Sequence, residues 1–261
     1  MDNREITSRF DANNYLFNKD SKYGIYIIHG FSSTTYEILK IAKHLSNYGY
    51  YVRADNLPGH GTTLEDCNLI TYQDWLMFVE QKIAEMYTHC SKVIVIGVSM
   101  GSVIALHLGT VFPLSGIIAS STLLKFKNEF NVRVLTRLFH RIKKSISKKS
   151  NFQPDQLKAL HEGFYGYRYY PLTALNEMRK MIDKIKPRFT KISSPVLLIH
   201  SKIDQTATFE NYHILKKLLV KAKIEELILN KTGHNVFDTD KKDKDQIFTS
   251  TFNFIEQHFN E

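Results

Sequence analysis

The chain has 261 residues, of which 43% are hydrophobic, and a formal net charge of +9. This length suits one large α/β domain with a full core, and the composition excludes a disordered or low-complexity protein. Cys67 and Cys90 are too few for a disulfide framework or a cysteine-based metal site, and free thiols are typical of a reducing compartment. The first residues lack the basic and then apolar pattern of a secretory signal, so we expect a cytoplasmic protein.

The positive charge is concentrated in one part of the chain. Residues 122–150 contain nine Lys or Arg and a single acid, Glu129, which places +8 of the formal +9 within 29 residues. Charge this local gives no reason to assign the whole domain to nucleic-acid binding. We therefore expect no nucleic-acid partner.

Apolar runs alternate with helical patterns along the chain, as expected of a mostly parallel sheet with helices on both faces. In chain order, strands are predicted at residues 25–29, 50–54, 93–96, 116–119, 195–200 and 224–229. Helices are predicted at 34–48, at 71–87, from 102 onward, and over the last residues up to 259. Thr34 and Glu37 are interpreted as a capping box, with Gly49 ending that helix. Before residue 25 there is room for only one or two short antiparallel edge strands.

The long uncharged stretch at residues 93–124 contains no Asp, Glu, Lys or Arg. It is long enough to suggest a membrane span. However, it contains several glycines and Pro113, and it divides into a strand, a helix and a second strand. We therefore interpret it as a buried core and predict no transmembrane segment.

The start of that stretch contains a G-x-S-x-G motif, Gly97-Val98-Ser99-Met100-Gly101. The motif follows a predicted strand and opens a predicted helix, which is the context of a nucleophile elbow. Small neighbours permit the sharp turn that presents the Ser99 hydroxyl, and the helix N-terminus favours developing negative charge. The pattern indicates a serine hydrolase with Ser99 as nucleophile.

A serine nucleophile needs a base and an orienting acid, which in this architecture follow it in the order acid, then histidine. Asp204 lies just after the strand predicted at 195–200, and His234 just after the strand predicted at 224–229. We therefore predict a Ser99–Asp204–His234 triad.

The other acids and histidines do not fit this chain order. Asp238 and Asp240 come after His234 and are interpreted as helix-start residues. Histidines elsewhere are more often structural than catalytic, and we assign a structural role to four of them: His29, His60, His107 and His200.

The oxyanion hole of such a site is built from two backbone N–H groups. One belongs to the residue after the nucleophile, here Met100, and the other to the loop after the first parallel strand, here Phe31. His29 and Gly30 are expected to shape that loop. No metal or other cofactor is needed for this chemistry.

Five segments share a known pattern: HGF at 29–31, DNLPGHG at 55–61, GVSMG at 97–101, Asp204, and Gly233 with His234. Together they resemble the bacterial carboxylesterase and monoacylglycerol lipase branch of the α/β-hydrolases, over most of residues 23–259. The resemblance implies the α/β-hydrolase fold, the triad and the two oxyanion donors named above. The chain departs from the family pattern at Ser102 and Ser201, where glycine is frequent, and at residues 205–207, where Pro or Val often follows the acid.

The resemblance is weakest in the middle of the chain, where the alternation of strands and helices stops. We expect a hydrolase core at 1–121 and 192–261, with an inserted helical cap, or lid, at 122–191. Within it, two sets of residues recur at helical spacing, one apolar and one basic: Leu135, Leu138, Phe139, Ile142 and Ile146; and Arg133, Arg137, Arg141, Lys144 and Lys148. This pattern indicates either an ordinary lid helix with a solvated outer face or a basic amphipathic helix that contacts an anionic lipid surface.

The function indicated is a cofactor-independent serine carboxylesterase acting on short- to medium-chain esters, with monoacylglycerols as candidate substrates. Phe31, Met100 and the tyrosine-rich stretch 163–171 could supply an apolar acyl pocket, although core packing explains such aromatic residues equally well. A thioesterase, an acyltransferase or another acyl hydrolase would use the same machinery. A non-catalytic binding protein of this fold is a further alternative, disfavoured by the intact triad, and an Asp-nucleophile hydrolase is disfavoured by Ser99.

Overall fold

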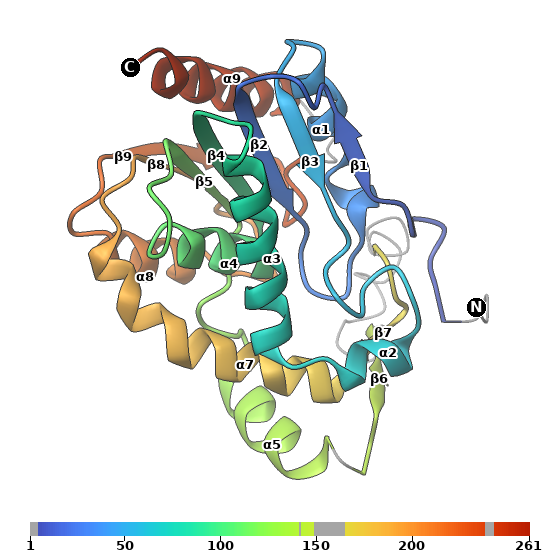
Figure 1. Cartoon of the computed structure of the whole chain (residues 1–261). Coiled ribbons are helices and arrows are strands. Elements are labelled where there is room, and N and C mark those ends of the chain that lie inside the picture. The colour runs from blue at the N-terminus through green and yellow to red at the C-terminus, as the bar shows by residue number, and fades with distance from the viewer. Residues whose placement is uncertain (1–4, 141, 149–164, 238–242) are drawn as a thin grey trace.

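A computed structural model describes residues 5–140, 142–148, 165–237 and 243–261 (Figure 1). In these residues, seven strands form the main sheet in the order β1-β3-β2-β4-β5-β8-β9. The edge strand β1 pairs antiparallel with β3, and all other neighbours are parallel. This confirms the six predicted parallel strands and one short antiparallel edge strand. The strands in sheet order are Tyr15–Phe17, Tyr51–Ala54, Tyr23–Ile28, Lys92–Val98, Gly116–Ser120, Val196–Ser201 and Ile224–Leu229.

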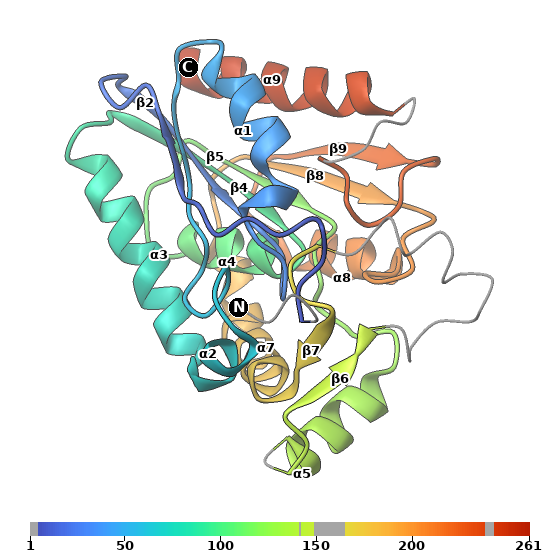
Figure 2. The ribbon, with the colours of Figure 1, turned by 90° about the vertical axis from the view of Figure 1, so that its right-hand side faces the viewer.

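Helices cover both faces of the sheet, as Figure 2 shows from the side. One face is covered by α1 (Leu39–Ser46) and α9 (Lys244–Asn260). The other is covered by α3 (Tyr72–Tyr87), α4 (Met100–Leu108) and α8 (Glu210–Leu218). Short α2 (Leu64–Leu69) precedes α3. The predicted mostly parallel α/β architecture is confirmed.

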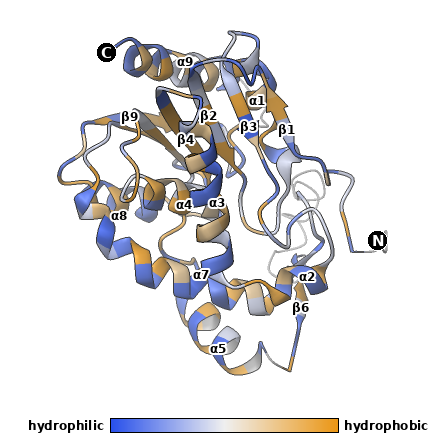
Figure 3. Ribbon diagram, viewed as in Figure 1, coloured by the Kyte–Doolittle hydropathy of each residue, from blue (hydrophilic) through white to orange (hydrophobic). Residues whose placement is uncertain are grey.

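Two buried apolar clusters, one on each face, hold these layers together. Successive side chains of a strand point to opposite faces, so Ile25 and Ile27 join the cluster under α1 and α9, whereas Tyr26 and Ile28 join the cluster under α3 and α4. Both sets must be apolar, which is why the central strands are coloured hydrophobic in Figure 3 while the outer helices carry both colours. The stretch at 93–124 is part of this core. In the described residues, no helix has the length and apolar character needed to cross a membrane.

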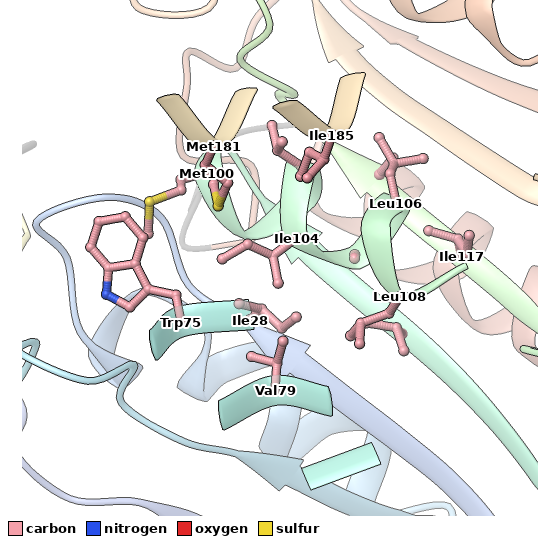
Figure 4. Close-up of a cluster of buried hydrophobic side chains, with 14 of the residues drawn as sticks. Ile28, Trp75, Val79, Met100, Ile104, Leu106, Leu108, Ile117, Met181 and Ile185 are labelled. Atoms are coloured by element: carbon pink, nitrogen blue, oxygen red, sulfur yellow. The ribbon is translucent and has the colours of Figure 1, made fainter. Parts of the chain in front are cut away.

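Residues 122–191 connect β5 to β8. Their described elements are a π-helical turn (Asn131–Leu135), α5 (Thr136–Phe139), the antiparallel pair β6 (Ser145–Ser147) and β7 (Tyr169–Pro171), α7 (Leu172–Ile185) and a 3₁₀ segment (Lys186–Lys191). The long helix α7 packs against α3 and α4 of the core. Its Met181 and Ile185 lie beside Met100 and Ile104 of α4, with Trp75 of α3 close to Met100 (Figure 4).

The prediction of one long basic amphipathic helix in this segment is wrong. Helical structure ends at Phe139, and residues 145–147 are instead extended because they pair with β7. The two expected faces do not form: Lys148 is buried, whereas Leu138 and Ile142 are 61% and 81% exposed. Arg133 donates two hydrogen bonds of 2.8 Å to the carboxylate of Asp183. Arg141 and the side chains of Leu135 and Phe139 lie outside the described residues.

The capping-box interpretation of Thr34 and Glu37 is also wrong. A single 3₁₀ turn (Thr35–Glu37) comes first and α1 begins only at Leu39, so Glu37 does not stand at the third position of the α-helix. The Thr34 hydroxyl accepts a hydrogen bond from the N–H of Asp11 instead. The Glu37 carboxylate is buried and accepts a hydrogen bond of 2.8 Å from the N–H of Gly30.

Candidate active site

Ser99 occupies a strained turn between β4 and α4. Its φ of 55° and ψ of −114° lie in a region that L-residues rarely adopt, and such strain persists only where the surroundings enforce it. A Cβ added at Gly97 would lie 2.2 Å from the Gly101 carbonyl oxygen, and one at Gly101 would lie 2.3 Å from that of Ile28. Only glycine fits at either position, so the two glycines allow β4 and α4 to pack closely around Ser99.

Asp204 and His234 come from the loops after β8 and β9, as predicted, and the structure brings them together. Nδ1 of His234 lies 2.7 Å from Oδ2 of Asp204. The other oxygen of that carboxylate accepts hydrogen bonds from the N–H groups of Thr206 (2.8 Å) and Ala207 (2.9 Å). The Asp204 carboxylate is therefore fixed in orientation, and it fixes the imidazole ring in turn.

The pairing changes the acid–base properties of both groups. Burial by itself lowers the pKa of His234, but the charge of Asp204, its hydrogen bond and the charge of Glu37 outweigh this and leave the pKa raised. Burial likewise raises the pKa of Asp204, but the charge and hydrogen bond of His234 and the Thr206 N–H outweigh it and leave the pKa lowered. Asp204 thus stays ionised and makes His234 a stronger base.

Two consecutive serines at the end of β5 connect the elbow to the histidine loop. The Ser120 carbonyl accepts a hydrogen bond of 2.9 Å from the N–H of Ser99. The Ser121 hydroxyl donates one of 2.8 Å to the backbone carbonyl of His234. Ser201 makes a similar link, because its hydroxyl donates to the Thr232 carbonyl and so joins the loop of Asp204 to the loop of His234.

Of the two predicted oxyanion donors, Met100 follows Ser99 directly, and Phe31 follows Gly30, where an added Cβ would lie 3.3 Å from Cβ of Ser99. Met100 is the first residue of α4, where backbone N–H groups have no partner within the helix. Phe31 follows β2, and its ring is partly exposed, in edge contact with His60 and Trp75. The expectation that the Met100 side chain lines an acyl pocket is wrong, because it is fully buried among core side chains such as Met181 (Figure 4).

The four histidines assigned a structural role are all buried and hydrogen-bonded to other groups. Nε2 of His29 accepts from the N–H of Leu57 at 3.0 Å, and Nε2 of His60 accepts from the N–H of Ser32 at 3.1 Å. Burial lowers the pKa of His29 to about 4 and that of His60 well below its usual value, so both rings are neutral acceptors. His107 contacts Glu80 and His200 contacts the Ala207 carbonyl.

The tyrosine-rich stretch is partly explained by core packing. Tyr167 is fully buried, and its hydroxyl donates to the Gly59 carbonyl at 2.8 Å. Asp238, Asp240 and residues 163 and 164 lie outside the described residues. In the ranges that are described, no three His, Cys, Asp or Glu side chains gather in an arrangement suited to a metal ion.

Sequence reasoning missed four residues near the site: Glu37, Ser121, Lys148 and Ser201. Glu37 and Lys148 are both buried and ionisable, but each sits in a pattern that suggests another role, a helix cap and a solvated helix face. Ser121 gave no signal beyond its place near the end of a predicted strand, and Ser201 was noted only as a position where the family often has glycine. Ser121 also has a positive φ, 47°, which no pattern of side chains indicates.

Comparison with known proteins adds the family. Residues 19–240 match the family described as serine aminopeptidase, S33. The chain belongs to this α/β-hydrolase family. A thermostable monoacylglycerol lipase of Bacillus sp. (strain H-257) is 23% identical over 244 residues, covering 93% of this chain and 94% of the lipase. A carboxylesterase of Bacillus subtilis (strain 168) is 22% identical over 243 residues, covering 92% of this chain and 94% of the esterase.

Solved structures of α/β-hydrolases share the fold. A structure described under LipS and LipT, two metagenome-derived lipolytic enzymes, superposes with a TM-score of 0.83 at 20% identity, covering 97% of this chain and 100% of that one. The monoacylglycerol lipase of Paleococcus ferrophilus superposes with a TM-score of 0.75 at 18% identity, covering 94% and 98%. The chain therefore shares the α/β-hydrolase fold over nearly the whole of the given sequence.

Proposed function

We propose that this hydrolase is a serine carboxylesterase that acts on short- to medium-chain carboxylic esters, monoacylglycerols among them, through Ser99, His234 and Asp204. The observation that carries the proposal is the 2.7 Å contact between His234 and Asp204 at the edge of the sheet where Ser99 occupies a strained elbow. The names of the two Bacillus relatives support the ester as substrate class.

The geometry suits a two-step acyl transfer. His234 takes the hydroxyl proton as Ser99 Oγ attacks the ester carbonyl carbon, and Asp204 stabilises the imidazolium that forms. The N–H groups of Phe31 and Met100 receive the negative charge that develops on the carbonyl oxygen. The C–O bond then breaks, His234 returns the proton to the departing alcohol, and the acyl group stays on Ser99. His234 then takes a proton from a water molecule, whose oxygen attacks the acyl carbon. The bond from that carbon to Ser99 Oγ breaks, His234 returns the proton to Ser99, and the carboxylic acid leaves.

Residues 122–191 are proposed as the cap of this site. The described part of this segment contacts the loop after β2: the N–H of Tyr167 donates to the Ser32 carbonyl at 3.0 Å.

Contact of the cap with an anionic lipid surface also stays a proposal, although the long basic helix on which it was based does not form. Its support is that α5 and the residues after it expose both apolar and basic side chains, namely Leu138, Ile142, Arg137, Lys143 and Lys144.

Covalent labelling tests the nucleophile. The wild type should react with a fluorophosphonate probe, and Ser99→Ala should not. Ser102→Ala is the matched control, because Ser102 lies three residues along and its hydroxyl contacts that of Thr122 at 2.6 Å. Full labelling of Ser99→Ala would refute the assignment, and an unreactive wild type would favour a non-catalytic binding protein.

A substrate panel tests the reaction class. p-Nitrophenyl esters and monoacylglycerols of graded chain length are compared with matched thioesters and with amino-acid p-nitroanilides. The anilides are included because the family takes its description from an aminopeptidase. Higher kcat/KM for neutral esters of small to medium acyl groups supports the proposal. Activity confined to acetyl esters, thioesters or amides would contradict it.

Lipid contact is tested by co-sedimentation with neutral and anionic liposomes at low and high salt.

A further inference from the structure

The loop that contains Phe31 is held on its core side by a buried carboxylate. Glu37 Oε2 accepts a hydrogen bond of 2.8 Å from the N–H of Gly30, the residue just before Phe31. A Cβ added at Gly30 would lie 3.2 Å from Glu37 Oε2 and 3.3 Å from Cβ of Ser99. The carboxylate is therefore a near neighbour of the nucleophile, although it belongs to neither the triad nor the oxyanion hole.

The same loop is held on its other side by Lys148, Gly166 and Tyr167. Ser32, just after Phe31, has a positive φ of 54°. Its carbonyl accepts hydrogen bonds from the N–H of Tyr167 at 3.0 Å and from Nζ of Lys148 at 3.4 Å. Gly166 lies so close that an added Cβ would stand 2.3 Å from the same oxygen. Lys148 is buried at the end of β6 and also donates to the Tyr165 carbonyl at 3.1 Å.

Glu37 and Lys148 also influence each other. Burial lowers the pKa of Lys148 to about 7, although the charge of Glu37 and the thiol of Cys67 act to raise it. Burial raises the pKa of Glu37, although the Gly30 N–H and the charges of His234 and Lys148 act to lower it. Two buried ionisable groups are costly to stability unless each compensates the other. Their burial at this loop therefore calls for a functional reason.

We propose that Glu37 and Lys148 are positioning residues that fix the Phe31 N–H in the oxyanion hole by holding the peptide groups on either side of it. The proposal rests on the proposed function and deepens it. Glu37 orients the Gly30 N–H and Lys148 the Ser32 carbonyl. The loop therefore presents the Phe31 N–H in one orientation before substrate arrives. Such preorganisation stabilises the transition state more than the bound substrate.

A double-mutant cycle tests this inference with Glu37→Gln, Lys148→Met and the double variant. The readouts are kcat and KM for p-nitrophenyl butyrate, the rate at which a neutral fluorophosphonate labels Ser99, and the melting temperature. Each single variant should lower kcat and the labelling rate by about 10- to 100-fold with KM changed less than about threefold, because a misplaced oxyanion donor weakens only transition-state binding. The double variant should lose less than the product of the single losses, since both residues act on the same loop and their charges interact.

Glu177→Gln and Lys180→Met are the matched controls. These residues form an acid–lysine pair on α7, 2.6 Å apart, in which Lys180 is exposed and Glu177 is buried where α7 meets the start of α3. Their kcat should stay within about twofold of the wild type. All rates are compared well below each melting temperature, and Glu37→Asp, which keeps the charge, replaces Glu37→Gln if the latter does not fold.

The outcomes separate this inference from the proposed function. A wild type that is neither labelled nor active on esters would overturn both. Normal labelling of the wild type with unchanged kcat in the Glu37 and Lys148 variants would overturn only the positioning role. Losses in KM alone, or losses that follow the melting temperature and occur equally in the α7 controls, would also overturn it.

Discussion

The Ser121 hydroxyl donates a hydrogen bond of 2.8 Å to the backbone carbonyl of His234, and the preceding residue, Ser120, accepts one from the N–H of Ser99. The end of β5 thus connects the backbones of the proposed nucleophile and the proposed base. Both hydrogen bonds involve the backbone, and not the side chain, of Ser99 or His234. They therefore fix the two backbones relative to each other whatever rotamers the Ser99 and His234 side chains adopt.

Ser121→Ala should therefore lower kcat/KM for a p-nitrophenyl ester. Loss of one buried hydrogen bond costs about 1 kcal/mol, and the freed His234 carbonyl lets its loop relax, so a loss of up to about tenfold is expected. Ser120→Ala is the control, because its hydroxyl is buried without a partner in the described residues and its backbone contact is retained. Equal kcat/KM for the two variants would show that the Ser121 hydrogen bond does not position His234.

Strain at Ser99 predicts a gain in stability when it is relieved. Ser99→Gly and Ser99→Ala both remove the hydroxyl, but only glycine adopts a φ of 55° without penalty. Glycine also adds entropy to the unfolded chain, which offsets part of this gain. We therefore expect the free energy of unfolding of Ser99→Gly to be about 1 kcal/mol higher than that of Ser99→Ala, or about 2–4 °C in melting temperature. Calorimetry of the two inactive variants measures the difference, and equal melting temperatures would mean that the turn stores no strain.

The pH dependence of the reaction should report His234. The base must be neutral, so kcat/KM falls as the pH drops below the pKa of His234, which lies above its ordinary value of 6.5. Asp204→Asn removes the charge that raises this pKa. The inflection should move to lower pH, and the plateau should fall by roughly 10³–10⁴-fold because the imidazole loses its orientation.

Asp238→Asn and Asp240→Asn are the comparisons for that experiment, because both residues lie close to His234 in the chain. Each should keep the position of the inflection and most of the plateau. A larger effect of Asp238→Asn than of Asp204→Asn would show that the catalytic acid lies on another loop and that the assignment to Asp204 is wrong.

The parts of the fold that the sequence predicts are those with local signals. Buried parallel strands such as residues 93–96 are continuous apolar runs, and the glycines around Ser99 are required by contacts within one strand–turn–helix unit. Asp204 and His234 were predictable because their places follow from strand order. The closeness of residues 204 and 234 follows from the topology of a parallel sheet, because the loops that follow its strands all lie at the same edge.

Glu37 and Lys148 show why the rest was not predictable. Glu37 stands three residues after Thr34, which is also the spacing of a capping box, and only the delayed start of α1 releases it to bind Gly30. Lys148 has helical spacing with Lys144, but β6 pairs with β7 more than 20 residues later, and this non-local pairing buries it. Local patterns do not encode such pairings.

The burial of Lys148 predicts a pH-dependent gain in stability for Lys148→Met. The pKa of Lys148 falls from 10.5 when exposed to about 7 in the folded protein. The folded state thus binds the proton less tightly than the unfolded state, and the resulting penalty is full below pH 7 and disappears as the pH rises towards 10.5. Lys148→Met should therefore melt above the wild type at pH 6, and this advantage should shrink as the pH rises and disappear near pH 10.5, even though the variant is less active.

Glu37 complicates this comparison because it loses the cation that lowers its own pKa. The same pair of melting curves is therefore recorded in a Glu37→Gln background, where that titration is absent. There the advantage of Lys148→Met at pH 6 should be larger, since Glu37 no longer compensates the buried ammonium. A melting temperature for Lys148→Met that is lower than its parent at every pH in both backgrounds would show that Lys148 stabilises the fold, which would contradict a buried charge retained at the expense of stability.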